Sequence, residues 1–167
     1  ASEYERELKG ILEGSNSMLR SVTKTTTVEE TQNYFLMEKV PFMVVRAAGS
    51  LGIDLVALRG EMSFPIEVKS SKHDVIRMSS KYLGGQADAY LELIEKARLV
   101  PLYAYRRKGV RGDSWRIFSL PFERKRGGTL ALYGVPRSRV TDAGNFVLDW
   151  ESGMPLNRFI SYIHNLA

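Results

Sequence analysis

The sequence predicts an α/β domain built around one central mixed β-sheet flanked by helices. Two observations lead to this fold class. Helical and β-branched segments follow one another in the order helix, strands, helix, strands, which is typical of a sheet covered by helices. The chain has 167 residues, of which 44% are hydrophobic and 26% charged. This length and composition suit a single domain over residues 1–167 and argue against disorder.

The first helix is predicted over residues 3–13. Its apolar side chains recur every three or four positions, as one buried helix face requires. These side chains are Tyr4, Leu8, Ile11 and Leu12. Gly14 and Ser15 follow as a stop signal. Residues 16–27 are polar and rich in threonine, so we expect a loop or a partly ordered insertion there.

A second helix is predicted to begin after Thr27. Thr27 and Glu30 have the spacing of a capping box, in which each side chain accepts a hydrogen bond from the other residue's backbone N–H. The helix is expected to run to about residue 39, because the residue before Pro41 is biased away from helical geometry.

The remaining elements follow from runs of apolar and β-branched residues. Three strands are predicted over residues 42–46, 53–58 and 64–69, and Arg59-Gly60-Glu61 turns the second into the third as a hairpin. Further on we expect helices over residues 83–97 and 156–165, strands over 100–105 and 115–118, and weaker strands over 130–133 and 146–148.

The formal charge of +5 is unevenly distributed. Residues 98–139 contain eleven basic and two acidic side chains, a local net charge of +9, so the rest of the chain carries −4. A basic stretch on a mildly acidic body suggests a polyanionic partner, although scattered surface arginines would give the same count.

Composition also excludes several kinds of site. The chain has no cysteine, which excludes disulfides, thiol nucleophiles and cysteine-ligated metals. Two histidines are too few for a histidine cage. No apolar run reaches the roughly 18 residues that span a bilayer, and the first residues are polar rather than signal-like. We therefore expect a cytoplasmic protein that does not bind membranes.

Asp54, Glu67 and Lys69 form the pattern that points to chemistry. Asp54 opens an apolar strand, and Glu67 and Lys69 are two residues apart in the next one, so their side chains share a face. The hairpin can place Asp54 beside Glu67, and converging carboxylates suit Mg²⁺, with Lys69 placed to position a water. A turn aspartate and a surface ion pair are the simpler alternative. Arg46, inside an apolar strand, needs a partner.

Four ordered segments carry a family resemblance. They are YERELKGILE at residues 4–13, VVRAAGS at 44–50, DLVA at 54–57 and IEVKS at 66–70. Together they resemble the archaeal Holliday junction resolvases of the restriction-endonuclease-like superfamily. The similarity continues at residues 85–87, is fainter at 141–147, and leaves out residues 14–40, which would be a family-specific insertion.

The resemblance implies a restriction-endonuclease-like fold and a Mg²⁺-dependent homodimeric nuclease, with Mn²⁺ as a possible substitute. It would resolve four-way DNA junctions by paired nicks during recombination and repair. The implied catalytic residues are Glu5, Asp54, Glu67, Lys69 and Ser50. The implied metal ligands are Asp54, Glu67, Glu5 and the carbonyl of Val68. The expected DNA contacts are Arg46, Lys72, Gln86, Arg106, Arg107, Lys108 and Arg111.

Two questions stay open at this point. Glu5 has the better local motif for the family's helix carboxylate, whereas an ungapped match backwards from Arg46 would select Glu30. The role of residues 14–40 as a lid, a dimer element or an insertion is also undecided. Functional alternatives are another repair or restriction-type nuclease of the same fold, and a non-catalytic nucleic-acid-binding module.

Overall fold

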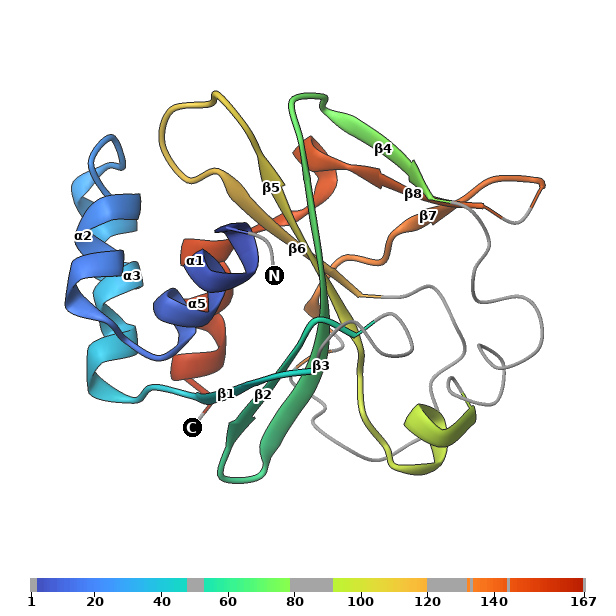
Figure 1. Ribbon diagram of the computed structural model, residues 1–167, viewed down its shortest axis with the longest axis horizontal. Coiled ribbons are helices and arrows are strands. Elements are labelled where there is room, and N and C mark those ends of the chain that lie inside the picture. Colours follow the sequence, from blue (N-terminus) through green and yellow to red (C-terminus); the bar gives the residue numbers. More distant parts are fainter. Residues whose placement is uncertain are drawn as a thin grey trace.

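Helices cover one side of a central sheet, and a smaller sheet lies on its other side (Figure 1). The computed structural model describes residues 3–47, 53–78, 92–119, 132, 134–143 and 145–166. Within these residues the main sheet has six strands in the order β1-β2-β3-β5-β6-β9, and a second sheet has three in the order β4-β8-β7. The predicted α/β class, with a central mixed sheet flanked by helices, is confirmed.

The helices are α1 (Glu3–Leu12), α2 (Asn16–Val22), α3 (Val28–Lys39) and α5 (Leu156–His164). The capping box of α3 is present: Thr27 Oγ1 accepts from Glu30 N at 3.2 Å, and Glu30 Oε1 accepts from Thr27 N at 2.9 Å. The expected loop over residues 16–27 is wrong, because α2 occupies most of it. Ser15 caps α2, and Leu19 is fully buried, so one apolar turn anchors this otherwise polar helix.

The main sheet contains β1 (Met43–Arg46), β2 (Leu55–Arg59), β3 (Met62–Ser71), β5 (Leu102–Arg107), β6 (Trp115–Ser119) and β9 (Met154–Pro155). Its neighbouring strands are antiparallel except for β3 and β5, which are parallel, so the sheet is mixed as predicted. The β2–β3 hairpin turns at Gly60, whose φ of 53° is a left-handed conformation that glycine adopts without strain.

The second sheet contains β4 (Val75–Met78), β7 (Arg139–Val140) and β8 (Phe146–Asp149), and a short 3₁₀ helix, η3 (Trp150–Ser152), follows it. The expectation of a single sheet is therefore incomplete. Strands β4 and β7 are only four and two residues long, and strands this short give no usable periodicity in the sequence.

The central strands are buried on both faces. On β5, Leu102 and Ala104 pack into the core under the helices, whereas Tyr103 and Tyr105 pack into a second core against the small sheet. Strand β1 is less buried than its apolar sequence suggests. It lies at the edge of the main sheet, and Met43 is 63% exposed.

Two predicted elements fall largely outside the described residues. Of the helix predicted over residues 83–97, only residues 92–96 are described as helical. Of the strand predicted over residues 130–133, only Leu132 is described, and it is buried within a core cluster rather than in a strand.

Candidate active site

The β2–β3 hairpin brings Asp54 to the strand that carries Glu67 and Lys69. The backbone N–H of Asp54 donates to the carbonyl of Ile66 at 3.0 Å. The backbone N–H of Val68 donates to Asp54 Oδ2 at 2.7 Å. These two bonds hold Asp54 beside the middle of β3. Its carboxylate lies next to the peptide bond between Glu67 and Val68. The predicted approach of Asp54 to Glu67 is present in the structure.

Glu67 and Lys69 share a face of β3 and form an ion pair, with 3.0 Å between Lys69 Nζ and Glu67 Oε1. The side chain of Glu67 is 10% exposed and that of Lys69 27%, so this pair is partly buried. In register beside them on β5 are Tyr103 and Tyr105, which are both fully buried. Charged groups in such surroundings interact more strongly than an exposed pair does.

Glu5 reaches the same region from α1. Its Oε2 lies 3.2 Å from Nη2 of Arg46 on β1, which supplies the partner that this arginine was expected to need. Arg46 pairs with Leu55 in the β1–β2 register, directly after Asp54. Glu30, the alternative carboxylate, is occupied in the capping box of α3. The structure therefore places Glu5 rather than Glu30 near Asp54.

The pKa of Asp54 is raised above its usual value of 3.8. Burial is the main cause; the negative charges of Glu5 and Glu67 add to it, while the Val68 hydrogen bond and the Lys69 charge oppose it. Protonated Asp54 therefore stabilises the fold below about pH 3.8, and this contribution is lost as the pH rises through the raised pKa. Glu5 and Glu67 therefore repel the ionised Asp54 carboxylate.

A bound cation would relieve this repulsion, and the donor set suits Mg²⁺, which prefers oxygen ligands. Among the described residues, no group of three or more His, Asp or Glu side chains is arranged to hold a metal ion. Mg²⁺, however, is commonly held by one or two carboxylates together with waters and substrate phosphate. Asp54 and Glu67 fit that pattern, and Glu5 and the Val68 carbonyl stay predicted ligands.

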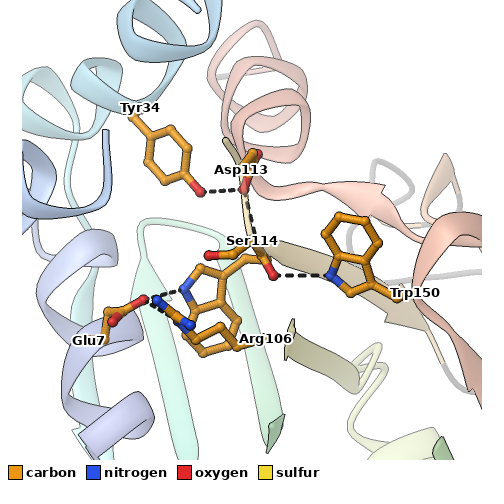
Figure 2. Close-up of polar contacts among 7 residues, drawn as sticks. Glu7, Tyr34, Arg106, Asp113, Ser114 and Trp150 are labelled. Atoms are coloured by element: carbon orange, nitrogen blue, oxygen red, sulfur yellow. Dashed lines mark hydrogen bonds and ion pairs between the residues drawn. The ribbon is translucent and has the colours of Figure 1, made fainter. Parts of the chain in front are cut away.

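Six of the seven residues predicted to contact DNA are described, and one of them, Arg46, is paired with Glu5. Arg106 Nε lies 2.9 Å from Glu7 Oε1 (Figure 2). The Arg106 guanidinium also stacks 4.7 Å from the centre of the Tyr4 ring. Arg107 lies over the Trp150 ring at 5.4 Å. These two arginines have partners within the protein. Three others are exposed: Lys72, Lys108 and Arg111. Of these, Lys108 also has a ring contact, with Nζ 5.4 Å from the centre of the Tyr4 ring. Ser50 and Gln86 lie outside the described residues.

Sequence reasoning missed two carboxylates, one partly buried and one buried, that join distant elements of the fold. Glu7 accepts hydrogen bonds from Arg106 Nε at 2.9 Å and from the Trp115 indole at 2.8 Å. Asp113 is 5% exposed and accepts from the hydroxyl of Tyr34 at 2.6 Å. One signal was available in the sequence: Asp113 is one of only two acidic residues in the basic stretch over residues 98–139.

The carboxylate of Asp113 accepts four hydrogen bonds. The other three donors are the backbone N–H of Trp115 at 3.2 Å, the backbone N–H of Asn157 at 2.8 Å and Asn157 Nδ2 at 2.7 Å. Burial and the neighbouring Asp113 raise the pKa of Tyr34, so its hydroxyl stays protonated and donates. This carboxylate therefore joins α3, α5 and the start of β6.

Comparisons with known proteins bear on what this site does. None of the described helices is long and apolar enough to cross a membrane. Among curated proteins, none matches the chain. A solved structure of the Holliday junction resolvase Hjc from the archaeal hyperthermophile Archaeoglobus fulgidus is similar at 18% identity and a TM-score of 0.47, over 75% of this chain and 89% of that one.

The family model described as archaeal Holliday junction resolvase (Hjc) matches residues 24–165. This range contains Asp54, Glu67 and Lys69, and it also takes in α3. The matched range begins after α1 and does not include Glu5. The position of Glu5 near the site rests on its ion pair with Arg46 and on the rise that its charge causes in the pKa of Asp54. Because the match spans most of its length, the chain belongs to the archaeal Holliday junction resolvase family.

Proposed function

We propose that this protein is a Mg²⁺-dependent nuclease that resolves four-way DNA junctions by paired nicks, in DNA recombination and repair. Family membership supports action on junctions. The arrangement of Asp54, Glu67 and Lys69 supports hydrolysis of a phosphodiester. The observation that carries the proposal is the Val68 N–H bond to Asp54, because it holds one carboxylate beside the Glu67–Lys69 ion pair.

Each residue of the site has a proposed role. Asp54 and Glu67 would hold the metal, and Glu5 and the Val68 carbonyl would complete its surroundings. When bound, Mg²⁺ or Mn²⁺ would polarise the phosphate and lower the pKa of a coordinated water. The ammonium of Lys69 orients the attacking water and offsets the negative charge that builds on the phosphate. Arg46 holds Glu5 in place through their ion pair.

DNA would be held through its phosphates rather than its bases. The exposed cations Lys72, Lys108 and Arg111 can contact backbone phosphates at the surface. Two nicks in opposing strands need two sites, so we propose a homodimer in which each subunit supplies one. We also propose a cytoplasmic location, where an archaeal cell keeps its DNA.

A panel of substrates tests this proposal. A four-way junction, a linear duplex and a single strand of matched sequence are incubated with the protein in Mg²⁺ and in EDTA. We expect cleavage of the junction only with Mg²⁺, at positions in two opposing strands. Preferred cleavage of linear duplex would favour a repair or restriction-type nuclease instead. Salt-sensitive binding without any cleavage would favour a non-catalytic module.

A second test separates Glu5 from Glu30. We expect Glu5→Gln to lower junction cleavage about 10-fold or more, because it removes a charge near the metal ligands and releases Arg46. Glu30→Gln is the matched control. It keeps the capping pattern and is expected to leave the cleavage rate unchanged, with a loss of stability below about 1 kcal/mol. Rates at saturating DNA and melting temperatures measure both effects; the reverse ranking of the two rates would contradict the assignment.

A further inference from the structure

We propose that the α2–α3 segment, residues 14–40, holds the basic turn between β5 and β6 in position to bind a DNA phosphate backbone. The basic turn is defined here as residues 108–112. The inference rests on the proposed function, since it names a binding surface for the same substrate. It also gives residues 14–40 a role that is neither a lid nor a dimer element.

The basic turn carries two exposed cations, and it contains two glycines, which favour a flexible backbone. Lys108 and Arg111 are both exposed. Gly109 and Gly112 have φ values of 78° and 79°, left-handed conformations that favour glycine. Glycines lose more conformational freedom than other residues when they are ordered. A turn of this composition would bind a phosphate backbone weakly unless something else fixed its shape.

The base of the basic turn is fixed by the sheet. The backbone N–H of Arg107 donates to the carbonyl of Ser114 at 3.0 Å, which closes the hairpin. The backbone N–H of Lys108 donates to the carbonyl of Ser71, the last residue of β3, at 2.8 Å. In the β3–β5 register Ser71 is opposite Arg107, two residues beyond Lys69, which is roughly 7 Å along the strand. The turn therefore begins close to the candidate active site.

The far side of the basic turn is fixed by the α2–α3 segment. Thr25, in the connection between α2 and α3, accepts a hydrogen bond on Oγ1 from the backbone N–H of Gly112 at 2.8 Å. Tyr34, on α3, donates to Asp113 immediately after the turn at 2.6 Å (Figure 2). Gly112 and Asp113 are consecutive residues, so the α2–α3 segment holds the end of the basic turn at two adjacent points.

Charge supports a phosphate as the ligand. Arg106, near the end of β5, is paired with Glu7, and Asp113, which directly follows the turn, is buried. Lys108 and Arg111 remain as the exposed charges between them. Fixing two cations on one rigid turn lowers the entropy that must be lost when they meet consecutive phosphates.

Thr25 offers a near-isosteric test, because valine removes the hydroxyl that accepts from Gly112 and serine keeps it. Affinity for a fluorescent four-way junction is measured by anisotropy in EDTA, across a range of salt concentrations. We expect Thr25→Val to bind the junction about 3- to 10-fold more weakly. This is the change in affinity that corresponds to losing one hydrogen bond that orders the basic turn. Thr25→Ser should restore wild-type affinity. Melting temperatures and cleavage rates at saturating DNA should stay unchanged, because Thr25 is exposed and its hydrogen bond is to Gly112 of the basic turn.

A second background shows whether Thr25 acts through the basic turn. In the double variant Lys108→Ala, Arg111→Ala, adding Thr25→Val should cause no further loss of affinity. An equal loss in that background, or wild-type affinity for Thr25→Val alone, would overturn the inference. Absence of junction binding by the wild-type protein would instead overturn the proposed function, so the two failures are distinguishable.

Discussion

Replacing Lys69 with methionine is expected to slow junction cleavage by roughly 100-fold or more, the range that a positioned proton-transfer or charge-stabilising group supplies. Methionine keeps the length of the side chain and removes its charge. The ammonium lies 3.0 Å from Glu67 Oε1, and its charge acts on the carboxylate of Asp54. Single-turnover rates at saturating Mg²⁺ and DNA measure the effect.

Lys96→Met is the matched control for this prediction. Lys96 also forms a lysine–glutamate pair at 3.0 Å, with Glu92, but its side chain is 73% exposed. Such a surface pair contributes little, so its loss should leave both cleavage and stability unchanged. Junction affinity should be similar for the two variants. A Lys69→Met protein that cleaves at the wild-type rate would show that this lysine takes no part in the reaction.

Replacing Asp113 with alanine is expected to destabilise the protein by about 3 to 5 kcal/mol, the usual cost of removing one partner from a buried charged network. The substitution leaves four buried donors without their acceptor, including the hydroxyl of Tyr34 and both N–H groups of Asn157. For a chain of this length the melting temperature should fall by about 10 °C or more. Thermal and urea unfolding, followed by circular dichroism, measure the change.

Asp142→Ala controls for the simple loss of an acidic residue. Asp142 is exposed, and a surface substitution of this kind usually changes stability by no more than about 0.5 kcal/mol. Equal stabilities of Asp113→Ala and Asp142→Ala would contradict the view that Asp113 is the carboxylate that joins α3, α5 and β6.

Much of the candidate site could be predicted from the sequence because its contacts are local. Asp54 and Val68 are 14 residues apart on the two strands of one hairpin, and the turn at Gly60 sets their register. The alternation of side chains along a strand then places Glu67 and Lys69 on one face. Short-range rules of this kind need no knowledge of the rest of the chain.

The supporting contacts could not be predicted in this way, because they join distant segments. Tyr34 and Asp113 are 79 residues apart, and Glu7 and Arg106 are 99 apart. No periodicity or spacing links such pairs in one sequence. The same limit explains why helix α2 was expected as a loop: a single buried leucine, Leu19, anchors it to a core assembled from the whole chain.

Glu5 is an intermediate case. Its 41-residue separation from Arg46 is not local, yet the apolar stripe of α1 predicted that this helix face meets the core. A carboxylate bordering that face then had to lie near the sheet. The structure adds the ion pair of Glu5 with Arg46 and its effect on Asp54, which favour Glu5 over Glu30, and the choice stays a prediction.

Cleavage of a four-way junction by the wild-type protein and by Asp54→Asn, side by side in Mg²⁺, tests the central claim most directly. Asparagine can still accept the Val68 N–H bond, and it removes the carboxylate whose pKa is raised by burial and by Glu5 and Glu67. The account predicts loss of cleavage with a melting temperature in EDTA that is equal or higher at pH 7. Equal cleavage by the two proteins, or no cleavage by either, would contradict it.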